Sequence, residues 1–413
     1  MRNTFYMEEN DHKKIGPELE LFYIDQTIGK GLPMFLPKGT IVKRELEKFV
    51  IEEETKRGYQ HVSTPDLARL ELYEKSGHYP HYKDSMYAPI EVDDERFMLR
   101  PMTCPHHFQM YLSRPHSYRE LPMRIAELAQ LYRYEQSGEL MGLIRTRNFC
   151  LADAHIICAN EEQAAEEVTG ALDLVEHMNG VFGLKLGVDY RFRLSMGDRA
   201  NTEKYYKNDA AWEKGENLLR KVMQKRGVEF EEAKDEAAFY GPKIDVQMKN
   251  VNGKEDTAFT VQYDFCMPDR FDLTYIGEDG QKQRAFVVHR SSIGSIGRTM
   301  AFLIEKFGGA FPTWLAPVQA IVLPIGEAHQ AFAKEAAEQL RAAGIRTELD
   351  MSNESLGKKI RAAKQMKIPY LLVIGDAEVA AGSASLESRT GKVGVLPIAE
   401  IVSKLQEEIA TRG

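Results

Sequence analysis

Three stretches decide the fold: Ile244-Asp-Val-Gln-Met248, Phe259-Thr-Val-Gln-Tyr263 and Phe286-Val-Val-His289, all within residues 239–298. Apolar and polar side chains alternate in the first two, which is typical of strands with one buried face. The breaks between the stretches have the length of hairpin connections, so they favour an antiparallel sheet over βαβ units. We therefore predict an α+β domain built on an antiparallel sheet.

Helical patterns lie upstream of these strands. Residues 40–58 carry apolar side chains at helical spacing, and Gly58 marks the end of the predicted helix. Tyr59-Gln-His-Val-Ser-Thr-Pro65 follows as a predicted strand that closes at a proline. A second helix is predicted from about Asn160 to Phe182.

The pattern changes after residue 310. From there strands and helices alternate, which indicates a small α/β domain of about 100 residues. The predicted elements are strands at 320–323, 346–349 and 370–374 and helices at 328–343, 355–366 and 398–411. We predict two domains, 1–310 and 311–413.

Composition limits the class of protein. The chain is 43% hydrophobic and 28% charged and has only four cysteines, which fits a soluble globular protein without a disulfide framework. No stretch approaches the roughly 20 apolar residues that span a bilayer, and residues 1–14 are too polar for a secretory signal. We expect a cytoplasmic location and no membrane partner.

The net charge of −8 does not exclude a nucleic-acid partner, because local basic clusters such as residues 358–367 decide such binding.

Three residues of the first predicted domain have the chemistry of zinc ligands: Cys104, His155 and His289. Each alone is a weak signal, but Cys104 lies in Arg100-Pro-Met-Thr-Cys-Pro105, where two prolines restrict the backbone. One Cys and two His would leave a tetrahedral position open, as in functional rather than structural zinc sites. The sequence contains neither a C-x-x-C pair nor an H-E-x-x-H helix, so standard zinc fingers and zincins are excluded.

Arginines gather in Tyr132-Arg-Tyr-Glu-Gln-Ser-Gly138, in Leu143-Ile-Arg-Thr-Arg-Asn-Phe149 and in Gly294-Ser-Ile-Gly-Arg298. A planar guanidinium can hold phosphate through two hydrogen bonds, so these segments are candidates for phosphate binding. A surface hairpin with paired arginines explains the first two segments equally well. Walker A, Rossmann and kinase signatures do not occur in the sequence.

Together these segments resemble the three signature motifs of class II aminoacyl-tRNA synthetases, and specifically the threonyl-tRNA synthetase family. The first motif resembles the helix and strand that end at Pro65, the second Arg133 through Phe149, and the third Gly294 to Arg298. The resemblance runs from about Asp11 to the C-terminus. It implies a class II catalytic domain followed by an anticodon-binding domain, and a homodimer formed through the segment around residues 40–65. The segments specific to the threonyl family are Arg100 to Cys104, Asp153-Ala-His155, Ala238-Phe-Tyr-Gly-Pro-Lys243 and His289-Arg290.

The resemblance also implies roles for individual residues. One zinc ion per chain would be held by Cys104, His155 and His289. ATP with Mg²⁺ would be bound by Arg133, Glu135, Arg145, Phe149, Gln262 and Arg298, with Glu135 and Phe149 on the adenine. L-threonine would be contacted by Asp153, Tyr240, Lys243 and Gln262. The residues counted as catalytic are Arg133, Arg298, Lys243 and His78, the last near the terminal ribose of threonine tRNA. The anticodon would be read by Asn353 and Glu378.

The sequence departs from the family pattern at some positions. Leu151 stands where many members carry glutamine, and Ser355 and Glu387 stand where some carry lysine and arginine. Bacterial members carry an N-terminal editing region that has no counterpart in these residues, so we expect serine to be attached to threonine tRNA and not removed. The alternatives are a synthetase of the same subclass for proline or serine, and a non-catalytic paralogue that binds tRNA.

Overall fold

The computed structural model describes residues 10–251 and 253–412, which form two compact units. The large unit comprises residues 24–33 and 47–301, and the small unit comprises the described parts of 1–23, 34–46 and 302–413. The predicted division into residues 1–310 and 311–413 stays a prediction.

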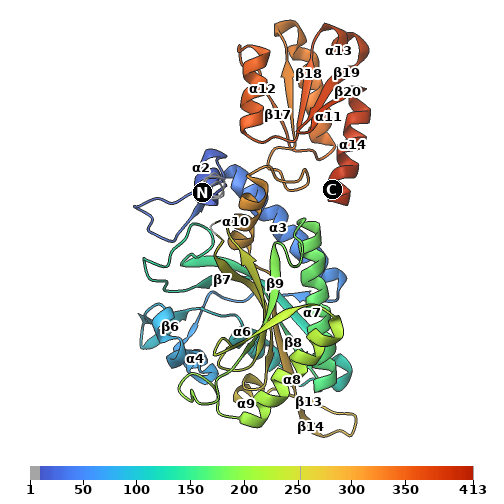
Figure 1. The fold of residues 1–413 in the computed structure, drawn as a ribbon. Coiled ribbons are helices and arrows are strands. Elements are labelled where there is room, and N and C mark those ends of the chain that lie inside the picture. The colour runs from blue at the N-terminus through green and yellow to red at the C-terminus, as the bar shows by residue number, and fades with distance from the viewer. Residues whose placement is uncertain (1–9, 252, 413) are drawn as a thin grey trace. The chain divides into compact units, whose positions relative to one another are not determined.

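An eight-stranded sheet organises the large unit (Figure 1). Its central strands pair antiparallel, whereas an edge strand on either side pairs parallel to its neighbour, so the predicted antiparallel sheet is confirmed. The strands lie in the order β10 (Phe230–Lys234), β9 (Tyr190–Met196), β11 (Lys243–Lys249), β12 (Glu255–Asp264), β15 (Phe286–Ser295), β8 (Asn148–Cys158), β7 (Met123–Tyr132) and β3 (Gln60–His61).

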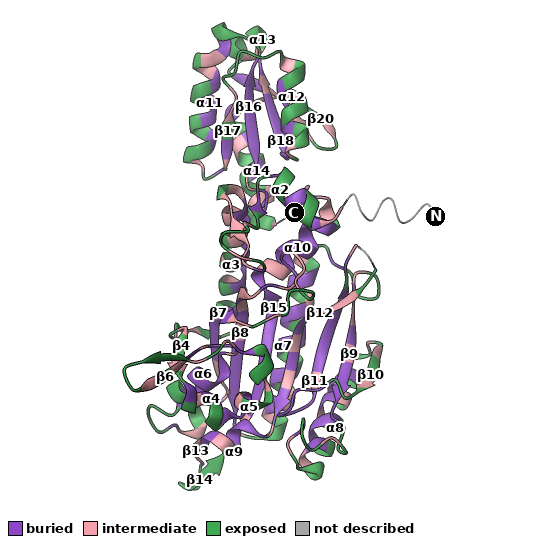
Figure 2. Cartoon of the chain, turned by 90° about the vertical axis from the view of Figure 1, so that its left-hand side faces the viewer, coloured by how far each residue is buried: buried purple, intermediate pink, exposed green. Residues whose placement is uncertain are grey.

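Helices α7 (Glu161–Val181) and α8 (Asp209–Arg226) pack against this sheet and against each other. The Asn160 side chain accepts a hydrogen bond from the backbone of Gln163 and caps α7, which confirms the predicted helix. Figure 2 shows the buried residues concentrated along the sheet strands and on the inward sides of these helices. The predicted helix at 40–58 is α3 (Pro37–Lys56).

Two local predictions are wrong. The strand expected over residues 59–65 is much shorter, because only β3 is a regular strand; beyond it Val62 donates to the carbonyl oxygen of Ala126 and Thr64 bonds the Glu127 side chain, both on β7. His289 was expected to end a strand but lies inside β15. Two of the polar residues that follow it are buried with a shared partner, because Arg290 and Ser292 both donate to Glu54.

The small unit contains a five-stranded sheet in the order β17 (Thr347–Leu349), β16 (Ala320–Pro324), β18 (Tyr370–Ile374), β19 (Ser383–Ser388) and β20 (Gly391–Pro397). The first three strands are parallel, as the alternating pattern predicted, and the last two are antiparallel. Its helices are α11 (Gln330–Ala342), α12 (Leu356–Gln365), α13 (Asp376–Ala381) and α14 (Ile398–Thr411).

Strands β19 and β20 and helix α13 were not predicted. Residues 392–395 of β20 are exposed and include a glycine, so the segment lacks the apolar alternation that reveals a strand. No helix within residues 10–251 and 253–412 combines the length and apolar character needed to cross a membrane.

Candidate active site

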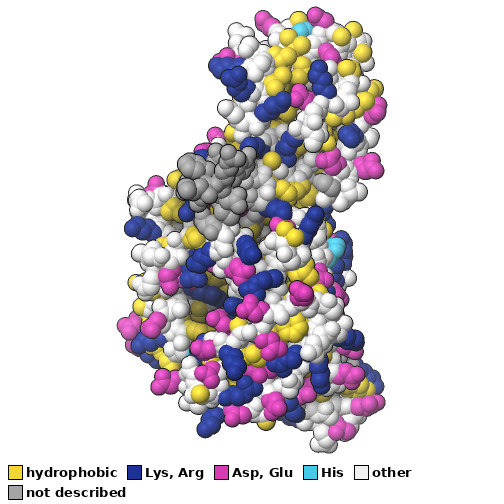
Figure 3. All heavy atoms as spheres, in the orientation of Figure 1, with side chains coloured by type: hydrophobic (Ala, Val, Ile, Leu, Met, Phe, Trp, Pro, Cys, Tyr) yellow, Lys and Arg dark blue, Asp and Glu magenta, His cyan; other side chains and the backbone are white. Residues whose placement is uncertain are grey.

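A cavity of about 730 Å³ opens in the large unit. Figure 3 shows Lys and Arg side chains gathered around a hollow on this face. The cavity is lined by β8, β11, β12 and β15, by the loop between β7 and β8, and by the start of α10 (Ile296–Phe307). Every large-unit residue predicted for zinc, ATP or threonine lines it; the one predicted site residue of this unit outside the lining is His78.

The three candidate zinc ligands meet at one end of the cavity. His289 of β15 lies directly opposite His155 of β8 in the antiparallel register, and their ring centroids are 4.6 Å apart. Cys104 begins helix α6 (Cys104–Tyr111). One ligand atom from each of the three buried side chains lies within 4.8 Å of the other two. Zinc binds nitrogen and sulfur at about 2.0–2.3 Å, so these atoms can surround one ion after small adjustments.

Both histidines use a second ring nitrogen for a hydrogen bond that holds the imidazole in place. His289 Nε2 is 2.7 Å from Asp264 Oδ2, and Asp264 Oδ1 in turn accepts from the backbone N–H groups of Cys266 and Met267. His155 Nδ1 is 2.8 Å from Nδ1 of His107. Such outer partners orient metal-binding imidazoles. The donor set and its supports therefore fit a zinc ion.

Burial sets the pKa values of these ligands. It raises the pKa of the Cys104 thiol, which Asp153 and Asp264 raise further. It also lowers the pKa of His155, with a further contribution from the nearby His289. A divalent cation would reverse the balance at the sulfur, because it stabilises thiolate directly.

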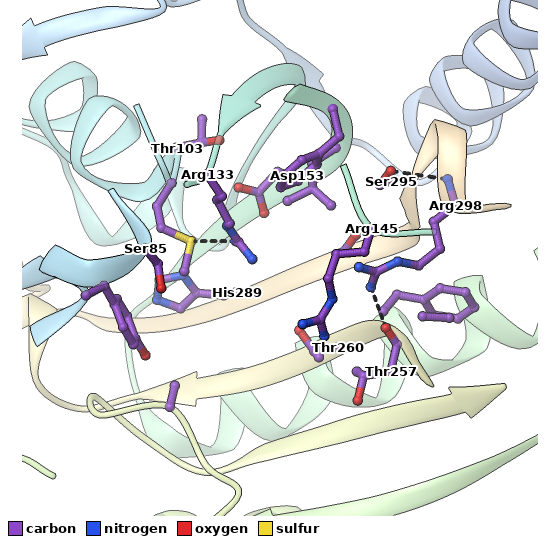
Figure 4. A pocket seen from close by; sticks show the side chains of 18 of the residues that line it. Ser85, Thr103, Arg133, Arg145, Asp153, Thr257, Thr260, His289, Ser295 and Arg298 are labelled. Carbon is purple, nitrogen blue, oxygen red and sulfur yellow. Dashed lines mark hydrogen bonds between the residues drawn. The ribbon is translucent and has the colours of Figure 1, made fainter. Parts of the chain in front are cut away.

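Polar groups next to the triad form a pocket suited to an amino acid. Tyr240 Oη donates to Gln262 Oε1 at 2.5 Å, and Gln262 Nε2 donates to Thr260 Oγ1 at 2.7 Å. The Tyr240 ring stacks on His289 with centroids 4.9 Å apart. Burial raises the pKa of Asp153, which also lines the cavity (Figure 4).

The register of the sheet places Lys243 in the same row as Gln262 and His289. Lys243 lies opposite Gln262, and Gln262 lies opposite His289, so the three residues form one row across β11, β12 and β15. Lys243 Nζ is held 2.6 Å from Asp245 Oδ1. A Cβ at Gly241 would lie 1.9 Å from the carbonyl oxygen of Tyr263, so only glycine fits between Tyr240 and Lys243 at this approach.

Arg145 and Arg298 line the other end of the cavity, and Arg133 lies between them and His289 (Figure 4). The guanidinium of Arg133 lies 5.2 Å from the ring centroid of Phe149. Arg298 donates to the carbonyl oxygens of Ile144 at 2.9 Å and Thr257 at 2.6 Å. Burial, with the charge of Arg133 nearby, lowers the pKa of Arg298 to about 10. These crowded cations favour an anionic ligand.

Arg145 and Glu135 border this end of the cavity. Arg145 Nη1 lies 3.8 Å from Glu135 Oε2 and from Glu139 Oε1. Its side chain is 40% exposed, so the guanidinium can approach a ligand from the solvent side. Leu151 also lines the cavity, at the position where a glutamine was expected.

His78 occupies a buried position beside the triad. Its Nδ1 is 2.7 Å from Ser76 Oγ, and its Nε2 is 3.7 Å from Cys104 Sγ. Burial, followed by the charge of His289, lowers the pKa of His78 to about 3, so the imidazole is neutral at physiological pH. The ring also packs edge-on against Phe239.

Several hydroxyl groups that line the cavity were not predicted: Thr103, Thr257, Thr260, Ser291 and Ser295. Such residues are common in strands and carry no chemical signature of their own. Thr260 could have been found from its place two residues before Gln262 on the same face of a predicted strand.

The predicted anticodon residues lie in the small unit. Asn353 is exposed between β17 and α12. Glu378 accepts hydrogen bonds from the backbone N–H of Gly375 at 3.0 Å and from Ser385 Oγ at 2.9 Å. Of the two departures, Ser355 precedes α12 as its N-cap residue, and Glu387 pairs with Lys364 at 2.6 Å.

Family models match both parts of the chain. Residues 87–307 match the class II core domain of tRNA synthetases (G, H, P, S and T), which covers all three candidate zinc ligands and most residues that line the cavity. Residues 319–408 match an anticodon binding domain, which covers the five-stranded sheet.

Curated relatives are threonine–tRNA ligases. The protein of Geobacillus sp. (strain WCH70) is 48% identical over 411 residues, which are 99% of this chain and 63% of that protein. The protein of Listeria welshimeri is 49% identical over 380 residues, 92% of this chain and 59% of that protein. The chain thus spans less than two thirds of the length of these relatives.

Solved structures agree. The RNA binding domain of threonyl-tRNA synthetase from Cryptosporidium parvum Iowa II superposes with a TM-score of 0.90 at 33% identity, over 96% of this chain and 98% of that one. Putative threonyl-tRNA synthetase ThrRS-1 from Aeropyrum pernix gives a TM-score of 0.84 at 26% identity, over 97% of each chain. The chain therefore belongs to the threonyl-tRNA synthetase family of the class II aminoacyl-tRNA synthetases.

Proposed function

We propose that the chain activates L-threonine with ATP and transfers it to the 3′ end of threonine tRNA. The observation that carries the proposal is the single cavity that joins the Cys104, His155 and His289 triad to the arginines at its other end. An amino acid held at the triad would direct its carboxylate toward a nucleotide phosphate held by the arginines.

Threonine selection would take place at the triad end. Cys104, His155 and His289 would hold one zinc ion, which would act as a Lewis acid toward both the amino group and the hydroxyl group of threonine. Valine has the amino group but no hydroxyl, so it could offer only one of these two groups. A pocket that relies on shape alone separates a methyl from a hydroxyl by only about 100-fold. Tyr240 and Gln262, already hydrogen-bonded to each other, would orient the substrate, with Asp153 accepting from its amino group.

ATP would lie along the arginine end with Mg²⁺ on its phosphates. Phe149 offers a flat face for the adenine, and the Arg133 guanidinium beside it would meet the α-phosphate. Arg298 and Arg145 would neutralise the β- and γ-phosphates. Attack of a carboxylate on the α-phosphate needs positioning and charge neutralisation more than a protein nucleophile, so this set suffices for adenylate formation.

Transfer to tRNA would involve both units. His78 is the residue proposed at the terminal ribose, and its neutral imidazole could accept a proton from a ribose hydroxyl once it turns out of its packing against Phe239. The small unit would bind the anticodon. A homodimer through residues 40–65 is also proposed, and light scattering would then give a mass near twice 47.0 kDa.

The decisive experiment is ATP–pyrophosphate exchange with each of the twenty amino acids, together with zinc analysis of the same preparation. The proposal requires exchange that is strongest with threonine and about one zinc per chain. Exchange with proline or serine as the best substrate would identify a different synthetase of the subclass. tRNA binding without any exchange would identify a non-catalytic paralogue.

A further inference from the structure

A line of hydrogen-bonded polar side chains leads away from the candidate zinc ligand His155. His107 Nδ1 is 2.8 Å from His155 Nδ1, and His107 Nε2 is 3.2 Å from Glu127 Oε2. Arg100 holds the far side of Glu127, with Nη1 and Nη2 each 3.2 Å from Oε1. Thr64 completes the set, because its N–H donates to Oε1 at 3.0 Å and its hydroxyl to Oε2 at 2.7 Å.

The carboxylate at the end of this line is held ionised. Burial alone would raise the pKa of Glu127, but hydrogen bonds with His107 and Thr64 and the charge of Arg100 outweigh it and bring the pKa to about 2. An ionised carboxylate can only accept hydrogen bonds. The N–H of His107 must therefore lie on Nε2, the nitrogen that faces Glu127.

The position of that proton on His107 sets the direction of the hydrogen bond between His107 and His155. The 2.8 Å contact between His107 Nδ1 and His155 Nδ1 needs one donor and one acceptor, and a His107 ring that donates from Nε2 leaves Nδ1 as the acceptor. His155 must then carry its own proton on Nδ1, the atom that faces His107. The lone pair of His155 consequently lies on Nε2, the nitrogen left for a metal ion.

We propose that His107 and Glu127 are positioning residues that select the metal-binding tautomer of His155, with Arg100 and Thr64 fixing the polarity of the line. The inference rests on the proposed zinc site. His289 is supported differently, by direct contact with the carboxylate of Asp264, so the two histidine ligands depend on separate partners. The segment that ends at Pro65 thereby gains a role in metal binding through Thr64.

Replacing Glu127 with glutamine should reverse the direction of the hydrogen bonds from residue 127 through His107 to His155, rather than simply weaken them. Oε1 meets only N–H donors, from Thr64 and Arg100, so the amide oxygen of glutamine would take that place. The NH₂ group would then face His107 Nε2 and donate to it. His107 would donate from Nδ1, and His155 would be left with its proton on Nε2, where it blocks the metal.

The experiment measures zinc affinity by chelator competition and the visible spectrum of the Co²⁺-substituted chain. Glu127→Gln should lower zinc affinity about 10- to 100-fold, the usual effect of removing an outer partner of a ligand, and should change the Co²⁺ bands. The matched control is Glu167→Gln, which also neutralises a buried carboxylate paired with an arginine, Arg124, and should bind zinc as wild type does.

A second pair of variants tests the acceptor itself. His107→Asn places an amide oxygen near the former Nδ1 and should retain more zinc affinity than His107→Leu, which offers no acceptor. The proposal would be overturned if both His107 variants bound zinc as tightly as wild type, or if Glu127→Gln left the zinc affinity unchanged. If Glu127→Gln does not fold, the His107 pair decides alone. A wild-type chain that binds no zinc would instead overturn the proposed function.

Discussion

His155 and His289 face each other across neighbouring antiparallel strands, so the backbone ladder of β8 and β15 sets the spacing of the two candidate nitrogen ligands. On the other side of His289, Gln262 occupies the matching position of β12. The candidate metal position and the proposed amino-acid pocket therefore share one row of a hydrogen-bonded sheet. A site built on rigid strands holds its geometry more closely than one built on loops.

The cavity predicts an order of amino-acid activation. Threonine should give the fastest ATP–pyrophosphate exchange, and serine should follow at about 10- to 200-fold lower kcat/KM, because it lacks one methyl group. Valine should be activated least, since it has no hydroxyl to offer the metal. Activation of valine at the rate of serine would contradict selection at the Cys104, His155 and His289 triad.

Arg298 should be irreplaceable by lysine. Its guanidinium donates to the carbonyl oxygens of Ile144 and Thr257 at once, and a single ammonium group cannot span both and still meet a phosphate. Arg298→Lys should lower kcat/KM for ATP in the exchange reaction by about 100-fold or more. Arg220→Lys, in a surface pair with Glu232, is the control and should leave it unchanged. An Arg298→Lys enzyme within tenfold of wild type would refute the assignment.

Sequence patterns predicted the elements whose side chains alternate or repeat strongly, such as β12 and α14. They failed where burial depends on distant partners. The run Arg290-Ser-Ser after His289 looked like the end of a strand, because the partner that permits its burial, Glu54, lies in a helix far away in the sequence. The residue types at the site were predictable, whereas strand register and the burial of His78 against Phe239 arise only from packing.

Gly294 should tolerate alanine much less well than Gly280, although both have φ of +74°. A Cβ at Gly294 would lie 2.2 Å from the carbonyl oxygen of Ala258, whereas one at Gly280 meets nothing within 4 Å. Gly280→Ala should cost about 1–2 kcal/mol in unfolding free energy, from the backbone conformation alone. Gly294→Ala should cost more in urea unfolding and should also slow exchange by displacing Arg298. Equal losses would mean that the close approach contributes nothing.

Glu53 should make stability depend on acid pH. Burial by itself would raise the pKa of Glu53, but hydrogen bonds from Lys56 and Arg57 and the charge of His177 outweigh it and lower the pKa to about 2, from an ordinary 4.5. The unfolded chain therefore binds the proton more readily, so this stabilisation is present above pH 4.5 and is lost as the pH falls toward 2.

Urea unfolding of wild type and Glu53→Gln across this pH range tests the dependence on Glu53. The difference in unfolding free energy should be largest above about pH 5 and should shrink on acidification. Glu52→Gln, whose carboxylate is 3.9 Å from Lys48 on the more exposed side of α3, should give a smaller difference throughout. A Glu53→Gln difference that stays constant from neutral to acid pH would contradict the ion-pair account.

Asn353 should affect tRNA recognition without affecting amino-acid activation. It follows β17, and Glu378 follows β18; since both strands run parallel to β16, the two residues lie beyond the same edge of the sheet, where ligands of such sheets bind. Glu378 is occupied by Gly375 and Ser385, so its replacement would also loosen α13, whereas Asn353 is exposed. Asn353→Ala should therefore raise KM for threonine tRNA about 3- to 10-fold, the effect of one lost hydrogen bond, with unchanged ATP–pyrophosphate exchange.

Glu335→Ala, exposed on α11, is the control. An Asn353→Ala enzyme with wild-type KM for tRNA would remove this residue from the anticodon site, and one with impaired exchange would mean that the small unit also shapes the active cavity.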